Sequence, residues 1–399
     1  MSALAIANVP IAGVSELIVA RARRAWLATE RGSAPATQSA AMALEALRDG
    51  TLLDSARETT AYHRCVAVLI MTDEVDAARR AIAALRGPAS AAAAWLHSEL
   101  ALRTGALSDA ERQATQALEI AGDAARAWSG ALRVLVCALA ERGAFDEGHE
   151  LLALLAPDSL ALLRARARLR LAEGRFEHAY ADACEVGTRL AHQGRLNPTW
   201  DGWRSTAALA LAHLGRRSEA AALAETELAL AGAFGAPVPI ARALAARAVA
   251  EPDDRARASL AEDSLRQLEH TPAVLESIRL RLELGGARAR TGRRIEARAD
   301  LRPALADADR AGALLLAQRA RRELVATGLR PRRAATNGPG ALTPRQQQIC
   351  ELAAAGKGNH AIADELFLSI KTVETHLAAA YRKLEVNRRG ELADSLAAP

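Results

Sequence analysis

Near the carboxyl end, one predicted helix brings together side chains that can contact both a phosphate backbone and the edges of bases. Its outer positions recur at each turn of a helix over 370–384 and so share one side of it: Lys371, Glu374, Thr375, Ala378 and Arg382. Lys371 and Thr372 stand at the amino end, where free backbone N–H groups and the helix dipole also favour a phosphate. The spacing therefore predicts an anion-contacting helix with a varied polar face.

The opposite side of this helix is apolar and predicts a small core. Ser369 is a good N-cap, and apolar residues follow at helical spacing: Val373, Leu377, Ala380 and Leu384. A second helix, over about 359–366, would turn Ile362, Ala363 and Leu366 inward, and only two residues separate it from Ser369. Such a tight pair is typical of a helix-turn-helix, whose second helix enters the DNA major groove.

Two further helices complete the predicted unit. Thr343 and Gln346 form a capping box around Pro344, and the helix that they begin would end before Gly356. Asn387 is the expected cap of a short fourth helix through Leu392 and Leu396. The open alternative is a four-helix tail that only packs against the rest of the chain.

The stretch LTPRQQQICELAAAGKGNHAIADELFLSIKTVETHLAAAYRKL resembles the LuxR-type DNA-binding domain almost end to end. The resemblance implies that Glu374, Thr375 and Ala378 touch bases, and that Lys371, Thr372 and Lys383 touch phosphates. It also implies a dimer on two half-sites of promoter DNA. We expect Arg382 to belong to the same DNA-facing surface.

The preceding part of this 399-residue chain predicts an all-α helical array over 1–325. Aromatic residues make up only 3%, and no stretch is convincing as a strand. Short turn units recur at helix-pair spacing, at Thr72, Gly105, Gly143, Gly174, Gly215 and Gly292, with a degenerate unit at Pro252. This pattern indicates irregular tetratricopeptide-like repeats with a concave face, and an ordinary helical bundle is the alternative.

The segment GRLNPTWDGW from Gly194 is the least helical part of the array and would be a long loop, with or without a pocket. Four tryptophans are candidates either for partner anchors or for core filling: Trp95, Trp128, Trp200 and Trp203.

The second half of the chain also resembles the large ATP-binding LuxR regulators that are similar to the MalT group. In that family an NTPase precedes the helical repeats, but no G-x-x-x-x-G-K-[ST] motif occurs here. We therefore expect no nucleotide site and no cofactor, and an NTPase on a separate chain stays open.

A linker is expected over 326–340, followed by the DNA-reading domain over 341–399. This linker contains Gly and Pro, and it carries Arg330, Arg332 and Arg333. We expect these arginines to be solvated, and the alternative is that they contact the DNA backbone as an arm. From 326 onward there are 10 Lys and Arg against 7 Asp and Glu, a net charge of +3 out of +5 for the whole chain. This basic surface is modest for a nucleic-acid binder.

Other classes of function find little support in the residues. Four scattered cysteines and nine histidines lack metal-ligand spacing, and there is no nucleophile–base motif, so we expect no enzyme, no catalytic residue and no metal. We expect no signal peptide or membrane span, and so a cytoplasmic protein.

These observations predict a transcription regulator. The terminal domain would read promoter DNA, while the array would sense a protein or small-molecule effector and set a homodimeric state. RNA polymerase is a further candidate partner. The alternative is a helical-repeat scaffold that binds another regulator and uses its last domain only for docking. The promoter, the effector and the sign of regulation stay open.

Overall fold

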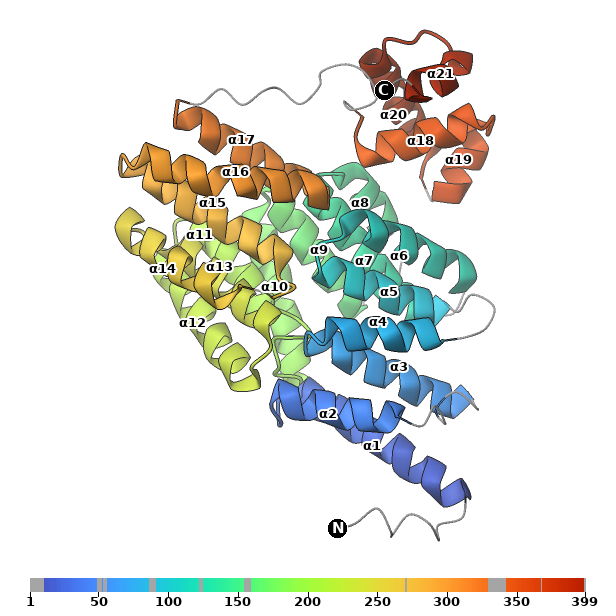
Figure 1. Ribbon diagram of the computed structural model, residues 1–399, viewed down its shortest axis with the longest axis vertical. Coiled ribbons are helices and arrows are strands. Elements are labelled where there is room, and N and C mark those ends of the chain that lie inside the picture. The colour runs from blue at the N-terminus through green and yellow to red at the C-terminus, as the bar shows by residue number, and fades with distance from the viewer. Residues whose placement is uncertain are drawn as a thin grey trace.

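The structure is a computed structural model that describes residues 11–48, 52, 56–85, 91–121, 125–153, 159–269, 271–328, 342–366 and 368–397. Within these ranges all regular secondary structure is helical, which confirms the predicted all-α class. Figure 1 shows an elongated helical array with a small helical domain at one end. No helix of the described part is long and apolar enough to span a bilayer.

The described residues of the array form seventeen helices. They are α1 (Ile11–Arg31), α2 (Ala36–Leu47), α3 (Ala56–Met71), α4 (Val75–Ala84), α5 (Ala91–Arg103), α6 (Leu107–Ala121), α7 (Ala125–Arg142), α8 (Phe145–Ala153), α9 (Leu160–Glu173), α10 (Phe176–His192), α11 (Trp203–His213), α12 (Arg217–Phe234), α13 (Pro237–Ala250), α14 (Asp254–Gln267), α15 (Val274–Arg290), α16 (Arg294–Ala311) and α17 (Leu314–Ala326).

Each predicted turn unit joins the two helices of one pair, from α3–α4 to α15–α16. The five glycines of these units have φ between 75° and 86°, a left-handed conformation that lets the chain reverse within two residues. Asp73 takes the same conformation in the first unit, with φ 64°. In the degenerate unit the side chain of Asp253 caps α14 by accepting from the backbone N–H of Ala256 at 2.7 Å. The prediction of irregular helix-pair repeats is confirmed.

The array curls until its last helices pack against its middle, so its concave side is partly closed. One core combines small and branched side chains of α5–α9 with others of α15–α17, among them Leu139, Leu282 and Leu324. Arg279 of α15 forms an ion pair with Glu141 of α7 across this contact. Figure 1 shows α15, α16 and α17 beside α7, α8 and α9. The curvature therefore encloses space between segments that are distant in sequence.

The terminal domain has a core of its own, built as the apolar spacing predicts. It contains α18 (Pro344–Ala354), α19 (Asn359–Leu366), α20 (Ile370–Leu384), a 3-10 turn η4 (Arg389–Glu391) and α21 (Leu392–Ala397). Its buried side chains include Ile349, Ile362, Val373, Leu377 and Leu392. The helix pair α19–α20 has the expected bounds, and both predicted caps, the Thr343 capping box and Ser369, are present.

The expectation that Asn387 caps the fourth helix is wrong. The chain enters through the 3-10 turn η4, and Glu391 supplies the cap from inside it. Its carboxylate accepts from the backbone N–H groups of Asn387 at 2.9 Å and Arg388 at 3.3 Å. An acidic side chain is well placed there because the amino end of a helical segment is positive.

Candidate nucleic-acid interface

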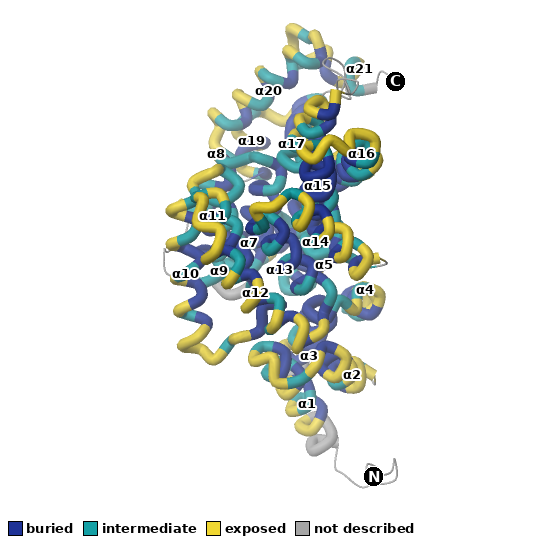
Figure 2. Tube along the Cα trace, turned by 90° about the vertical axis from the view of Figure 1, so that its left-hand side faces the viewer, coloured by how far each residue is buried: buried dark blue, intermediate teal, exposed yellow. Residues whose placement is uncertain are grey.

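One side of α20 is open to solvent and carries most of the residues predicted to contact DNA. Lys371, Glu374, Thr375, Ala378 and Arg382 are all exposed. The hydroxyl of Thr375 donates to the backbone carbonyl of Lys371 at 2.8 Å. Figure 2 shows α20 at the end of the molecule, with exposed positions along it. The structure thus brings these five residues onto one accessible face.

The two remaining predicted contacts, Thr372 and Lys383, are engaged within the protein. Lys383 is half-buried and donates from Nζ to Oε1 of Gln346 at 2.6 Å. Burial, together with the nearby Arg382, lowers the pKa of Lys383 from its ordinary value. Thr372 is also half-buried, and its hydroxyl donates to Oε1 of Glu150 at 3.0 Å. Both side chains would have to exchange a protein partner for a phosphate.

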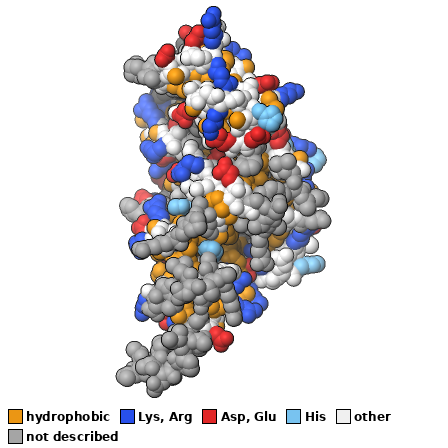
Figure 3. Space-filling view, turned by 90° about the vertical axis from the view of Figure 1, so that its right-hand side faces the viewer, with side chains coloured by type: hydrophobic (Ala, Val, Ile, Leu, Met, Phe, Trp, Pro, Cys, Tyr) orange, Lys and Arg blue, Asp and Glu red, His pale blue; other side chains and the backbone are white. Residues whose placement is uncertain are grey.

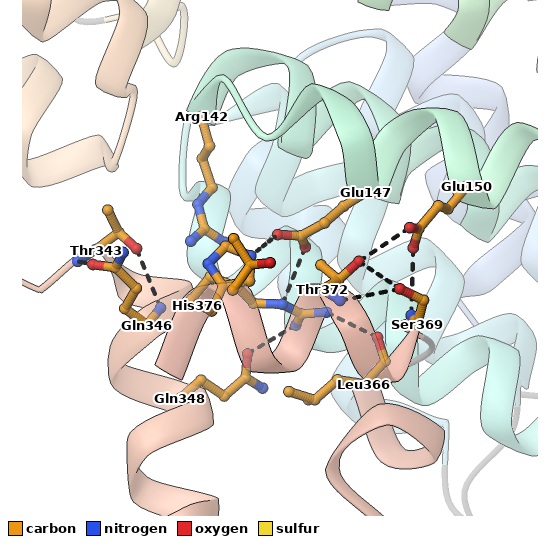
Figure 4. A network of polar contacts seen from close by, with 12 residues as sticks. Arg142, Glu147, Glu150, Thr343, Gln346, Gln348, Leu366, Ser369, Thr372 and His376 are labelled. Carbon is orange, nitrogen blue, oxygen red and sulfur yellow. Dashed lines mark hydrogen bonds and ion pairs between the residues drawn. The ribbon is translucent and has the colours of Figure 1, made fainter. Parts of the chain in front are cut away.

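The amino end of α20 faces helix α8 of the array, as Figure 4 shows. Glu150 accepts from the Thr372 hydroxyl and, at 3.4 Å, from the backbone N–H of Ser369. One turn further along α20, Nε2 of His376 lies 2.6 Å from Oε1 of Glu147. Two carboxylates of α8 thus contact the side of α20 that adjoins the exposed face.

A buried cluster of charges fixes the same contact from α18. Arg345 is 5% exposed, and its Nη1 lies 3.1 Å from Oε1 of Glu111 while its Nε lies 3.2 Å from Oε2 of Glu147. Arg142 also forms an ion pair with Glu111. Such a cluster stabilises the contact most when it is complete, because removing one member leaves a buried charge without a partner.

Ionisation of this cluster is shifted by its surroundings. Burial pushes the pKa of Glu147 upward, but the hydrogen bond from His376 and the charges of Arg345 and Arg142 outweigh it, so the pKa is lowered. Burial lowers the pKa of Arg142 to about 10, the pull of Glu147 opposes this, and the repulsion of Arg345 adds to it. At neutral pH the carboxylate and both guanidinium groups are therefore charged.

Glu150 occupies the position that an anion would take at the start of α20. The backbone N–H groups there and the positive end of the helix dipole attract a carboxylate and a phosphate in the same way. A DNA phosphate that approached Ser369 and Thr372 would meet the carboxylate of Glu150. Full access to this end of α20 requires the terminal domain to move away from α8.

Sequence reasoning missed Glu147, Glu150 and Arg345 as parts of this site. Glu147 belongs to the turn unit at Gly143, where an acidic residue was interpreted only as the start of a helix. Nothing local distinguishes it from the acidic residues of the other units. The arginines at 330, 332 and 333 lie outside the described residues. On the face shown in Figure 3, acidic and basic side chains are intermixed, in keeping with the modest net charge.

Comparison with known proteins identifies the terminal domain. Residues 340–396 match the family described as bacterial regulatory proteins, luxR family. A putative HTH-type transcriptional regulator of Mycobacterium tuberculosis, Rv0890c, is 38% identical over 85 residues, which are 21% of this chain and 9% of that protein. The transcriptional regulatory protein LiaR of Bacillus subtilis is 46% identical over 52 residues, 13% of this chain and 25% of that protein. The chain thus spans a quarter or less of these relatives.

Residues 340–396 belong to the luxR family of bacterial regulatory proteins, which confirms the resemblance of the terminal helices. The match points to a regulator rather than an enzyme. Among solved structures, a Rap protein complexed with competence and sporulation factor aligns over 96% of this chain and 99% of that one, with a TM-score of 0.47 and 11% identity.

Proposed function

We propose that this protein is a DNA-binding transcription regulator whose helix α20 reads promoter DNA in the major groove. The observation that carries the proposal is the exposed face of α20, with Lys371 at the positive end of the helix and Glu374, Thr375 and Ala378 behind it. A helix-turn-helix presents this part of its second helix to the bases. The luxR-family match of residues 340–396 supports the same function.

Within this function the residues divide by their chemistry. Lys371, Thr372 and Lys383 contact phosphates, which position the domain on the duplex without reading its sequence. Thr375 and Ala378 offer apolar contact to a thymine methyl group, and Glu374 accepts from the amino group of cytosine. Arg382 extends the basic end of the same face toward the backbone or a guanine.

We further propose that the helical array controls access to this face. In the docked arrangement Glu147 and Glu150 hold α20 against α8, and Glu150 takes the place of a phosphate at its amino end. An effector or protein partner that bound the array more tightly in the undocked arrangement would raise the affinity for DNA. The largest possible gain equals the ratio of the effector's affinities for the undocked and the docked arrangements. Action as a homodimer on two half-sites, in the cytoplasm and with RNA polymerase as a partner, belongs to the same proposal.

Titration of the intact protein with labelled duplex DNA at several salt concentrations tests the proposal. The logarithm of the affinity should fall linearly with the logarithm of salt, with a slope near −0.9 for each phosphate neutralised. A helical-repeat scaffold whose terminal domain only docks to another protein is the competing function. Absence of binding at the lowest salt, both for the wild type and for a Glu150→Gln variant, would favour that scaffold.

A further inference from the structure

The curled array encloses a cavity of about 240 Å³ that the DNA-reading function leaves unused. Its walls come mainly from the first helix of successive pairs, α1, α3, α5, α7, α9, α11, α13 and α15, together with α10. Residues 193–202, between α10 and α11, close one side. The sequence predicts a long loop from Gly194 in this segment and leaves open whether the loop shapes a pocket. Engineered protein cavities of about 150 Å³ hold benzene, so this one has room for a small organic molecule.

The loop is fixed to the opposite wall by specific contacts. Asn197 donates from its side chain to the backbone carbonyl of Thr29 at 2.7 Å, and the Thr199 hydroxyl donates to that of Met71 at 2.5 Å. The rings of Trp26 and Trp200 lie 4.6 Å apart between centroids. The cavity is therefore built before any ligand arrives, which lowers the entropic cost of binding.

Cationic side chains outnumber carboxylates in the cavity wall. Of the described residues that line it, seven are arginines and four are acidic: Glu99, Glu141, Asp201 and Glu276. Five of the arginines form ion pairs, such as Arg133 with Glu99 and Arg164 with Asp201. Arg168 of α9 and Arg242 of α13 have no ion-pair partner among the described residues. The wall thus holds two cations whose charge is not balanced by a direct partner.

Hydrogen-bonding groups in the wall show the same imbalance. Nε of Arg242 and Nε1 of Trp200 are buried donors that find no acceptor in the described part of the chain. A buried donor left unpaired costs about 1–3 kcal/mol, so an acceptor is expected at this point. Water would accept a hydrogen bond but would not offset the positive charge. An anion would do both.

The electrostatics of Arg242 agree with this geometry. Burial, and then the charges of Arg168 and other arginines, lower its pKa to about 10, although Glu276 and Glu227 pull the other way. Among the ion pairs of the described residues none joins Glu227 to Arg242; the Glu227 carboxylate accepts from Ser205, and burial raises its pKa although the Ser205 hydrogen bonds and the charge of Arg242 pull it down. Arg242 is therefore a buried cation with a second cation, Arg168, acting on it, while the carboxylates of Glu276 and Glu227 act on it without a direct ion pair among the described residues.

Building on the sensory role of the array proposed above, we propose that this cavity binds a small organic anion. Its carboxylate or phosphate would lie between Arg168 and Arg242 and accept from Trp200, while its apolar part would lie against Trp95 and Trp203. Guanidinium groups suit both anions because they can donate two parallel hydrogen bonds. A peptide of several residues is too large for the volume, so the ligand is a single small molecule.

Calorimetric titration of the intact protein with matched aryl probes tests the inference. Benzoate and phenyl phosphate carry the two candidate anions, and benzyl alcohol is the neutral control. We expect one site for at least one of the anions, with an affinity at least about tenfold above that for the alcohol, or about 1.4 kcal/mol. Comparison of the two anions distinguishes a carboxylate ligand from a phosphate ligand.

Two variants of cavity arginines and one control variant test whether the anion binds at the proposed site. Arg242→Met should weaken anion binding about tenfold or more, and Arg168→Met, which keeps the test available if the first variant misfolds, should do the same. Arg302→Met removes an exposed charge from α16 and should leave binding unchanged. Failure of both anions to bind at millimolar concentration, or equal binding by all three variants and the wild type, overturns the inference. Because no DNA is present, this outcome is distinct from a failure of DNA binding.

Discussion

Nε2 of His376, on the DNA-reading helix, lies 2.6 Å from Oε1 of Glu147, on a helix of the array 229 residues earlier in the chain. Glu147 is only 2% exposed and is also an ion-pair partner of Arg345. One carboxylate therefore contacts both helices, α18 and α20, that must move if the terminal domain leaves the array. The charge state and identity of the residues at this contact should govern access to DNA.

Removing the acidic competitor at the start of α20 should strengthen DNA binding. We expect Glu150→Gln to raise the affinity of the intact protein for duplex DNA several-fold, on the order of 1 kcal/mol. Glu177→Gln makes the same change of net charge at an exposed position of α10 and should have little effect. Fluorescence anisotropy at fixed salt measures both. Equal affinities for the two variants would mean that Glu150 does not compete with DNA.

Acid should release the terminal domain. The pKa of Glu147 lies below its ordinary value of 4.5 in the docked arrangement. A lowered pKa means that the contribution of this carboxylate to docking is complete above the ordinary value and is lost as pH falls through the lowered one. Fluorescence energy transfer between dyes on the array and the terminal domain should therefore fall in this acidic range. In a Glu147→Gln chain it should be low already at neutral pH. A contact that persists unchanged in both cases contradicts the assignment.

Lys371 and Thr375 should affect DNA binding in different ways. Lys371→Ala removes a phosphate contact, so it should weaken binding to all sequences and reduce the salt slope by about 1. Thr375→Val removes a hydroxyl from the base-reading face and should change preference at one base pair by about 1–3 kcal/mol. The measurement is specific against non-specific affinity for each folded variant. If Lys371→Ala alters the ratio and Thr375→Val does not, the assigned face of α20 is wrong.

Two helical glycines should respond to alanine in opposite directions. A Cβ atom at Gly187 of α10 would lie 2.5 Å from the ring of Trp203, a cavity residue, whereas one at Gly232 of α12 has no neighbour within 4 Å. Gly187→Ala should destabilise the array by about 1–3 kcal/mol through overpacking. Gly232→Ala should stabilise it by about 0.5–1 kcal/mol through lower chain entropy in the unfolded state. Denaturant unfolding measures both, and stabilisation by Gly187→Ala would contradict the packing.

Short-range signals made much of the fold predictable. Thr343 and Ser369 mark helix starts within three residues of their partners, and the apolar spacing from Val373 to Leu384 defines a helix face without distant information. The turn units were equally local, because a tight reversal between two antiparallel helices often needs a residue at positive φ, which glycine adopts most easily and which marks five of the seven units. The prediction that Asn387 caps the fourth helix was wrong because a favourable cap residue does not decide whether an α-helix or a 3-10 turn follows.

Long-range contacts were not accessible in this way. Arg279 and Glu141 are 138 residues apart and Arg345 and Glu111 are 234 apart, and each residue alone is typical of a solvated helix surface. Only the curvature of the assembled array brings them together. The loop from Gly194 was recognisable from its composition, but its attachment to Thr29 and Met71 depends on the same curvature. The exposed face of α20 was foreseeable, whereas the acidic helix beside it was not.

If this protein reads duplex DNA through α20, as we propose, the base preference must depend on the exposed face of that helix. Selection of bound duplexes from a random pool, with the intact wild type, the Glu150→Gln variant and a Glu150→Gln/Thr375→Val double variant, tests it most directly. We expect one enriched sequence for the wild type, stronger enrichment of that sequence by Glu150→Gln, and a changed base preference for the double variant. No enriched sequence from either of the first two proteins, or the same sequence from all three, would contradict it.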